Sequence, residues 1–290
     1  MPLLTARAPA KINLTLHVLA RRADGLHDLE SLVAFAGVGD ALTFAPGGPL
    51  ALTLAGPTAS AAGTADDNLV LRAVRALGER ATSLQAGTFH LTKRLPVAAG
   101  IGGGSADAAA ALRLLAQANS IALDDPRLLE AARAVGADVP VCLAPRARMM
   151  RGAGEATGLA LKLPPLFAVL VNPGVAVGTR DVFARMGIAP GEATGFGAHP
   201  EIKPGMSFDG LIRALAKGRN DMEDAAILLA PRISDVLAVL SAARGCRLAR
   251  MSGSGATCFA LFEDCRAAAK AAKVIARDHS GWWVKATALR

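Results

Sequence analysis

A glycine-rich segment that runs directly into an alanine-rich stretch constrains this 290-residue chain more than any other feature. The segment covers residues 95–111 and reads LPVAAGIGGGSADAAAA, with glycines at Gly100, Gly102, Gly103 and Gly104. Consecutive glycines leave backbone N–H groups unshielded by side chains and permit positive φ angles. A helix that begins here adds unpaired N–H groups and the positive end of its dipole. The segment therefore predicts an anion site, and the commonest anion at such a site is phosphate.

Two well-known phosphate loops do not match this segment. A Walker A loop requires Gly-Lys, and no glycine in the chain is followed by lysine. The dinucleotide pattern G-x-G-x-x-G fails because Ser105 stands where the third glycine should be, which argues against a dinucleotide oxidoreductase. A simpler interpretation is a glycine-rich turn that caps a helix, with Ser105 as the N-cap. Four glycines within five residues exceed what one cap requires, so we favour the phosphate loop.

Composition indicates a globular protein with an anionic ligand. Hydrophobic residues make up 52% of the chain, charged residues 19%, and the net charge is +8. The basic residues are scattered and aromatic residues reach only 4%, which argues against nucleic acid as the partner. No apolar run reaches the length of a membrane span, and Lys11 interrupts any signal-peptide core. The four cysteines lack C-x-x-C spacing and are expected to be core thiols in a reducing cytoplasm.

The residues 11–18 alternate strictly between polar and apolar side chains, which predicts a half-buried strand. Lys11 and Asn13 then share one face and could contact the same ligand. The simpler interpretation of that face is that solvent covers it.

The remaining pattern predicts an α+β fold, because strands and helices do not alternate regularly. Strands are expected at 31–35, 41–44 and 50–54, separated by Gly/Pro turns, and then at 88–92, 166–171, 258–262 and 282–286. Helices are expected at 125–135, 208–217, 221–229 and 234–244, besides one that follows the glycine-rich loop and one that Asp66, Asp67 or Asn68 caps. Residues 187–207 form a long loop. A domain boundary is expected between residues 154 and 165.

Six short motifs follow one another along the chain. They are APAKIN at 8–13, RADGLH at 22–27, DNL at 67–69, KRLP with GIGGGS at 93–105, GADVP at 136–140 and SGSG at 252–255. Each alone has an ordinary structural interpretation, such as a turn aspartate or a tight hairpin. In this order they resemble the GHMP small-molecule kinases over nearly the whole chain. The resemblance is closest to the branch that phosphorylates a cytidine diphosphate derivative of methylerythritol in the non-mevalonate isoprenoid pathway.

The resemblance implies a two-domain GHMP kinase fold. Residues 1–157 would form an N-terminal domain like ribosomal S5 domain 2, and residues 158–290 the C-terminal GHMP domain, with the active site in the cleft between them. Asp138 would be the general base and Lys11 its cationic neighbour. A carboxylate accepts the proton of the alcohol during its attack on the γ-phosphoryl group, and Lys11 can stabilise the developing alkoxide or favour the charged carboxylate.

The resemblance also assigns the ligand contacts. The ATP phosphates would bind the loop residues Pro96, Gly100, Gly102, Gly103, Gly104 and Ser105. Adenine would lie near Asn68 and Lys93, and the cytidyl substrate near Asn13, His27 and Phe183. The cofactor would be ATP with Mg²⁺, although the sequence identifies no protein ligand of the metal. The expected protein is cytoplasmic, a monomer or homodimer, with a small-molecule substrate and neither nucleic acid nor membrane as partner.

Two departures from the family pattern stand out. Leu26 occupies the place of an aromatic residue before His27, which weakens one side of an aromatic sandwich on cytosine. The loop opens with Val97, Ala98 and Ala99 rather than with further glycines, so its first turn is less free to move. Two alternatives stay open: a GHMP kinase for another alcohol such as mevalonate or homoserine, and a non-catalytic nucleotide-binding module. The presence of both Lys11 and Asp138 argues against the second.

Overall fold

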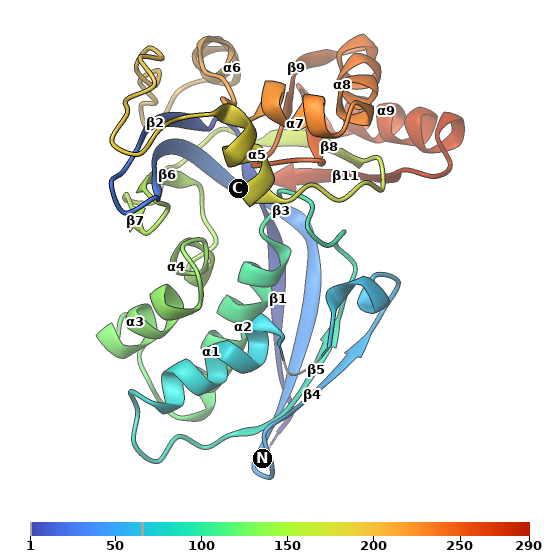
Figure 1. Ribbon diagram of the computed structural model, residues 1–290. Coiled ribbons are helices and arrows are strands. Elements are labelled where there is room, and N and C mark those ends of the chain that lie inside the picture. Colours follow the sequence, from blue (N-terminus) through green and yellow to red (C-terminus); the bar gives the residue numbers. More distant parts are fainter. Residues whose placement is uncertain (1, 65–66) are drawn as a thin grey trace. The chain divides into compact units, whose positions relative to one another are not determined.

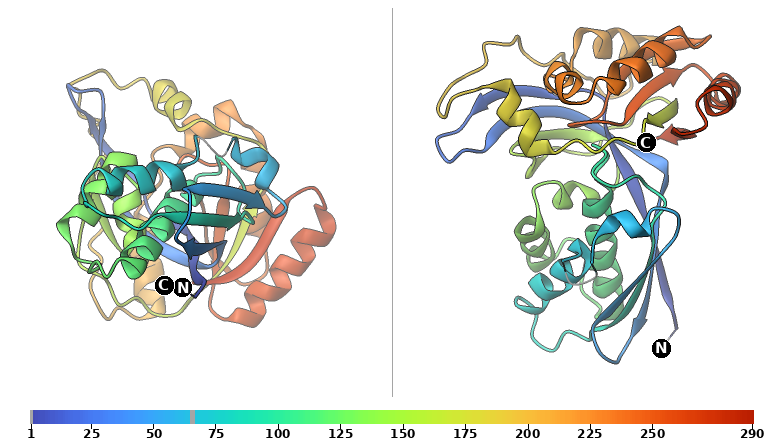
Figure 2. Two further views of the ribbon diagram at one scale, coloured as in Figure 1. Left: turned by 90° about the horizontal axis from the view of Figure 1, so that it is seen from below. Right: turned by 45° about the vertical axis from the view of Figure 1, so that its right-hand side comes forward.

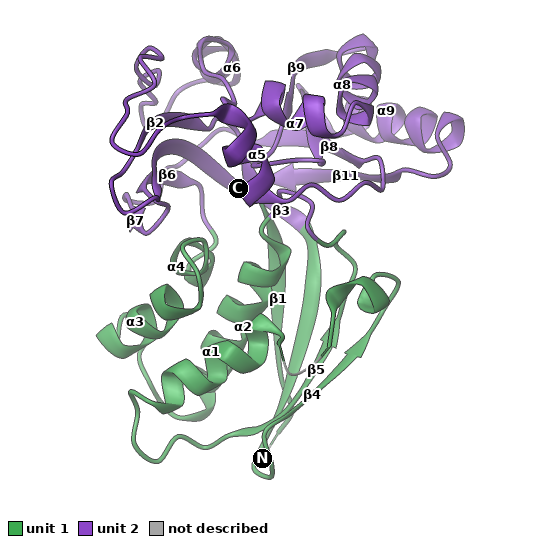
Figure 3. Cartoon of the chain, viewed as in Figure 1, with its two compact units in different colours: residues 1–11, 38–97, 102–145 green, residues 12–37, 98–101, 146–290 purple. Residues whose placement is uncertain are grey.

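The computed structural model describes residues 2–64 and 67–290, which divide into two compact units (Figure 3). Unit 1 comprises the residues up to Lys11 with 38–97 and 102–145, and unit 2 comprises 12–37, 98–101 and 146–290. Each unit combines helices with strands, which confirms the α+β class. The units interleave along the chain, whereas the predicted division is a single cut after residue 157. That division stays a prediction.

Unit 1 packs helices on one side of a small sheet (Figure 1). Strand β3 (His27–Pro46) pairs with β1 (Leu4–Asn13) and, antiparallel over its last six residues, with β5 (Gly87–Thr92), while β4 (Ala51–Ala55) runs parallel to β5. The helices are α1 (Leu69–Gly78), α2 (Gly103–Ala118), α3 (Pro126–Val135) and α4 (Val139–Leu143), besides the short 3-10 helix η1 (Ala59–Ala62).

Local sequence signals account for the starts of these helices. The Asn68 side chain caps α1 by accepting a hydrogen bond from the Val70 N–H at 3.0 Å, and Asp125 caps α3 in the same way. Of the other two predicted caps, Asp67 precedes the N-cap residue Asn68, and Asp66 lies outside the described residues. Helix α2 is buried on nearly all sides, with every residue from 106 to 112 covered.

Strand β3 corrects the prediction of two short strands at 31–35 and 41–44. It runs through Gly37 and Gly39 without a turn. A Cβ on Gly39 would lie 2.4 Å from the Ala8 carbonyl oxygen, so this glycine lets the neighbouring strand approach closely rather than turning the chain. An isolated glycine in a strand pattern can mark a turn or the close approach of another strand, and sequence alone does not distinguish the two.

The alternating segment 11–18 also differs from the prediction. Strand β1 ends at Asn13, and β2 (His17–Arg21) begins only after a break at residues 14–16. Both faces are buried: Lys11, Asn13, Thr15 and His17 are at most 4% exposed. The half-buried interpretation is therefore wrong. Polar side chains can be covered here because most find partners, such as the Thr15 hydroxyl with the His199 ring at 2.6 Å.

Unit 2 contains a four-stranded antiparallel arrangement with the order β11 (Trp283–Leu289), β8 (Leu166–Asn172), β10 (Cys258–Phe262) and β9 (Cys246–Met251). Helices α8 (Arg232–Ala242) and α9 (Cys265–Asp278) pack on it (Figures 1 and 2). The first half of β3 pairs with β2 and β6 (Arg148–Gly152), and β7 (Ala156–Thr157) pairs with β6. Helices α5 (Thr179–Met186), α6 (Phe208–Lys217) and α7 (Glu223–Leu229) complete the unit.

The cysteines follow the prediction of core thiols only in part. Cys142 and Cys258 are buried, Cys246 is half-buried, and Cys265 is exposed at the start of α9. All four are free thiols. Among residues 2–64 and 67–290, none of the helices combines the length and apolar character that crossing a membrane requires.

The alanine-rich opening of the glycine-rich loop carries backbone strain. Ala98 has a φ of 50°, in the left-handed region where a Cβ is unfavourable. We expect Ala98→Gly to raise the free energy of unfolding by about 1 kcal/mol, because glycine removes the strain and loses only part of the gain to unfolded-state entropy. Denaturant unfolding measures this change. Ala99→Gly, at a buried neighbour without a positive φ, should destabilise instead; equal effects of the two variants would contradict the account.

Candidate active site

A lysine and an aspartate form an ion pair in unit 1. The Lys11 ammonium, on β1, donates to Asp138 Oδ1 at 2.8 Å. The Lys11 side chain is 5% exposed, whereas that of Asp138 is 39% exposed. Asp138 stands at the N-cap position of α4 but makes no capping hydrogen bond. Its carboxylate is thus oriented by a buried cation and stays accessible, which is the arrangement that a general base for a bound hydroxyl requires.

The glycine-rich loop ends against this ion pair. Gly102, the N-cap residue of α2, has a φ of 60°, and a Cβ there would lie 3.3 Å from Lys11 Cβ and Cε. The close approach between Gly102 and the lysine stem places the N-terminus of α2 beside Lys11. The first N–H groups of a helix have no partner within it and carry the positive end of the dipole. Lys11 therefore lies between the N-terminus of α2 and the Asp138 carboxylate in unit 1.

The glycines of the loop do not all have the same role. Gly100 and Gly102 adopt positive φ, whereas Gly103 and Gly104 belong to the first turn of α2 and do not. At Gly103 a Cβ would make only ordinary contacts, the nearest at 3.6 Å from Lys93 Nζ. The cap itself is Gly102, so the interpretation of Ser105 as N-cap is wrong. Conformational freedom is needed at the two glycines before the helix, and the later two leave its N-terminus uncovered.

A second glycine-rich turn braces the loop within unit 2. The Ser252 hydroxyl donates to the Gly100 carbonyl at 3.0 Å, and the Thr257 N–H donates to the Ala99 carbonyl at 3.2 Å. A Cβ on Gly253 would lie 2.6 Å from the Gly100 carbonyl oxygen. The SGSG motif is thus a packing partner of residues 99–100. Sequence reasoning placed this motif in the pattern but gave it no structural role.

The side chain of Asn220 holds that second turn in place. Its amide donates to the Met251 and Gly253 carbonyls at 2.9 and 2.8 Å, and the residue is 8% exposed. Sequence reasoning missed Asn220, because a lone asparagine before a helix carries no signal of a partner 31 residues away.

Lys93 lies in a buried cluster of charges in unit 1. Its ammonium donates to Asp40 Oδ2 at 2.5 Å and to Asp107 Oδ2 at 2.7 Å, and all three side chains are at most 4% exposed. Asp40 Oδ1 also accepts from the N–H groups of Arg94 and Leu95, at the entrance to the loop. Burial lowers the pKa of Lys93, but the two carboxylates outweigh it and raise that pKa overall. Lys93, predicted near adenine, is therefore held by two carboxylates that sequence reasoning missed.

The second carboxylate of this cluster makes stability depend on pH. Burial raises the pKa of Asp107 to about 7, against the opposing effect of Lys93. The folded protein then holds a proton on Asp107 at a pH where the unfolded chain has lost it. This contribution stabilises the fold fully at low pH and is lost as the pH rises from about 4 to about 7.

We expect Asp107→Asn to remove that dependence, because the amide does not titrate. The variant should gain stability relative to the wild type as the pH rises from about 5 to about 8. Unfolding both proteins with denaturant at the two pH values measures the difference. A difference that does not change with pH would contradict the proton uptake by Asp107.

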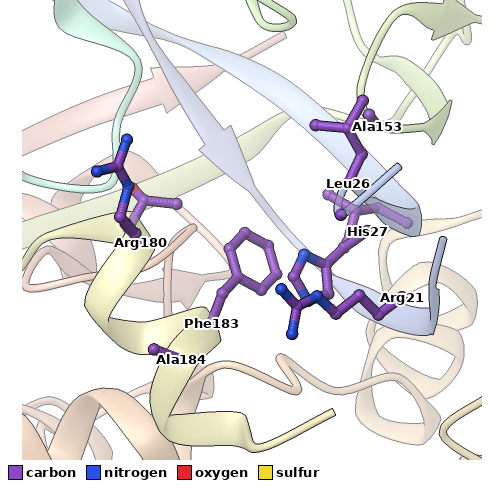
Figure 4. A pocket seen from close by; sticks show the side chains of 10 residues that line it. Arg21, Leu26, His27, Ala153, Arg180, Phe183 and Ala184 are labelled. Carbon is purple, nitrogen blue, oxygen red and sulfur yellow. The ribbon is translucent and has the colours of Figure 1, made fainter. Parts of the chain in front are cut away.

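Two stacked rings line a cavity of about 550 Å³ in unit 2 (Figure 4). The His27 and Phe183 rings lie 3.9 Å apart between centroids and 9° from parallel. Burial, with a smaller effect of the Arg21 charge, lowers the pKa of His27. Leu26, which takes the place of an aromatic residue in the family pattern, also lines the cavity but is 51% exposed, and the imidazole of His27 faces the Phe183 ring.

Asn13 is fixed by unit 2 on both its backbone and its side chain. Its N–H donates to Ser252 Oγ at 3.0 Å, and its amide donates to Ser31 Oγ at 2.8 Å. Lys11 and Asn13 therefore bind different partners, although the strand pattern set them on one face. Within residues 2–64 and 67–290, no three His, Cys, Asp or Glu side chains gather in an arrangement that could hold a metal ion.

Comparison with known proteins identifies relatives over the whole length of the chain. Family models for the GHMP kinases N terminal domain and the GHMP kinases C terminal domain match residues 68–145 and 205–280. A 4-diphosphocytidyl-2-C-methyl-D-erythritol kinase from Methylobacterium radiotolerans is 61% identical, and one from Xanthobacter autotrophicus is 58% identical, each covering 100% of both chains.

Solved structures of GHMP kinases also resemble this chain over nearly its whole length. A crystal structure of 4-(cytidine 5'-diphospho)-2C-methyl-D-erythritol kinase superposes with a TM-score of 0.76 and 33% identity, covering 99% of both chains. A homoserine kinase from Cytophaga hutchinsonii, 18% identical, has a TM-score of 0.69 and covers 99% of this chain and 95% of its own. At that identity the second likeness concerns the fold alone.

Proposed function

Because the chain belongs to the GHMP kinases, and among them to the 4-diphosphocytidyl-2-C-methyl-D-erythritol kinases, we propose that Lys11 and Asp138 perform the phosphoryl transfer of that family. The chain is an ATP-dependent kinase of the non-mevalonate isoprenoid precursor pathway. Its substrate is 4-diphosphocytidyl-2-C-methyl-D-erythritol, which we propose it phosphorylates at the 2-hydroxyl.

The observation that carries the residue assignment is the ion pair between Lys11 and Asp138 beside Gly102. The first turn of α2 binds the γ- and β-phosphates through its free N–H groups. Asp138 accepts the proton of the substrate hydroxyl as its oxygen attacks the γ-phosphorus. The Lys11 ammonium offsets the negative charge that develops on that oxygen. The bond from phosphorus to the bridging oxygen breaks, and ADP leaves with the electron pair.

We propose that Mg²⁺ enters the site with ATP. Mg²⁺ usually keeps several waters and binds one or two carboxylates together with substrate phosphates, so it needs no dedicated cage. The site beside the loop fits that mode, because the described residues form no cage of three carboxylate, imidazole or thiol ligands there and the phosphates would supply most of the oxygens that hold the ion. When bound, the ion neutralises charge on the β- and γ-phosphates.

We assign the rest of the ligand contacts by the same family relationship. Pro96 and the residues Gly100–Ser105 line the phosphates, Asn68 and Lys93 lie near adenine, and Asn13, His27 and Phe183 bind the cytidyl substrate. For Lys93 the contact with adenine would come from its stem or backbone, because two carboxylates already hold its ammonium. We further propose a cytoplasmic monomer or homodimer that binds no nucleic acid.

An ATP-consumption assay across a panel of alcohols tests this function. The panel includes mevalonate, homoserine and methylerythritol derivatives with and without a cytidine diphosphate group. Consumption that depends on the cytidine diphosphate group supports the proposal. Consumption with mevalonate or homoserine alone would indicate another GHMP kinase, and ATP binding without consumption would indicate a non-catalytic module.

A further inference from the structure

Among the described residues, the cavity that holds the His27–Phe183 stack is lined by two guanidinium groups and by no carboxylate. Arg21 and Arg180 are its charged lining residues, and they lie on opposite sides of Phe183 (Figure 4). A cavity with one sign of charge concentrates ligands of the other sign. The lining therefore favours a ligand that carries negative charge on part of its surface.

Arg180 occupies a position where a cation does not help the helix that carries it. It lies in the first turn of α5, at the positive end of the helix dipole, where a negative charge is favoured instead. Among the described residues its side chain makes no hydrogen bond and no ion pair, and it is exposed. The nearby carboxylate of Asp181 turns back over Gly178 and does not line the cavity. Neither helix stability nor ion pairing accounts for Arg180.

The helix places Arg180 and Phe183 one turn apart on the same face. Residues at i and i+3 are neighbours on a helix surface, with a rise of about 4.5 Å between them. Ala184, next along this face, also lines the cavity and leaves room there. A ligand ring against Phe183 thus has a guanidinium within reach of the substituents that extend toward the start of α5.

The guanidinium of Arg21 already makes a hydrogen bond within the protein. Arg21 donates from one terminal nitrogen to the Ile188 carbonyl at 3.0 Å, while its Nε is buried without a partner in the described part of the chain. Arg21 lies close enough to His27 for its charge to lower the pKa of the imidazole. Arg21 therefore lies beside the stacked rings of His27 and Phe183. Arg180 is the charged lining residue whose guanidinium has no partner among the described residues, so it can bind a phosphate.

We propose that Arg180 binds the diphosphate of the cytidyl substrate and so selects a nucleoside diphosphate ester over an uncharged nucleoside. The inference rests on the proposed function, because that function supplies the cytidine diphosphate group. The guanidinium offers paired N–H donors whose planar geometry suits phosphate oxygens.

Titration calorimetry with cytidine and with CDP tests the inference. Wild-type protein should bind CDP more tightly than cytidine. Arg180→Gln should lose about ten- to a hundredfold of its CDP affinity and none of its cytidine affinity, because only the charge-assisted hydrogen bonds disappear. Arg180→Lys should keep part of the preference. Raising the salt concentration should weaken CDP binding in the wild type more than in Arg180→Gln.

Arg185→Gln is the matched control, since Arg185 is an exposed arginine of the same helix that does not line the cavity. It should bind both ligands as the wild type does. An Arg180→Gln protein that keeps the full preference for CDP would overturn the role of Arg180 while leaving the proposed function intact. A wild-type protein that binds neither ligand would overturn the cytidyl substrate, and this inference with it.

Discussion

Replacing Asp138 with asparagine should lower kcat by about 10²- to 10⁴-fold, the range for a positioned general base. The amide has nearly the shape of the carboxylate but cannot accept the hydroxyl proton. It can still accept a hydrogen bond from the Lys11 ammonium, which lies 2.8 Å from Oδ1, so the site should stay assembled. Steady-state kinetics with saturating ATP and substrate measure the loss.

Binding of ATP separates the chemical role of Asp138 from a structural one. Affinity for ATP, measured by calorimetry, should change little in Asp138→Asn, because the phosphates bind the start of α2. The matched control is Asp125→Asn, at a partly exposed helix cap of the same unit, which should keep its turnover. Near-normal kcat in a folded Asp138→Asn protein would show that another group accepts the proton.

The buried cluster around Lys93 should dominate the stability of unit 1. Lys93→Met removes the cation that lies between two buried carboxylates at 2.5 and 2.7 Å. Breaking a buried ion pair in this way typically costs about 3–5 kcal/mol, because a charge is left uncompensated. The free energy of unfolding in denaturant should fall by that amount at pH 8.

A second substitution keeps this prediction testable even if the single variant folds poorly. Lys93→Met combined with Asp107→Asn removes one of the stranded carboxylates and should recover part of the loss. Lys203→Met is the control, since its ion pair with Glu201 is exposed and should be worth less than about 1 kcal/mol. A Lys93→Met protein as stable as that control would contradict the account of the cluster.

The sequence predicts most of the elements because their signals are local. Helix α6 has the predicted bounds, and so does strand β10, since a cap, an apolar period and a run of apolar residues mark them directly. The ordered motifs also single out Lys11 and Asp138, which the structure pairs across 127 residues of chain. That pairing came from the family resemblance, because no local pattern joins two residues so far apart.

What the sequence does not predict depends on distant partners. Alternation in residues 11–18 sets Lys11 and Asn13 on one face but does not say what covers that face. In the sequence, Gly39 indicates a turn. In the structure, a Cβ on Gly39 would lie 2.4 Å from the neighbouring strand, so the glycine allows a close approach instead. Asp40 and Asp107 lie in no motif that indicates a shared lysine, so their charge cluster follows only from the fold.

The central claim is that this chain transfers the γ-phosphoryl group of ATP to the hydroxyl of a cytidine diphosphate alcohol through Asp138. Phosphorus-31 NMR of one reaction, with ATP, Mg²⁺ and 4-diphosphocytidyl-2-C-methyl-D-erythritol, tests it most directly. The account predicts a new phosphomonoester signal that grows in step with ADP for the wild type and is about 10²-fold slower or more for Asp138→Asn. ADP formation with free inorganic phosphate and no phosphomonoester, or equal rates for the two proteins, would contradict it.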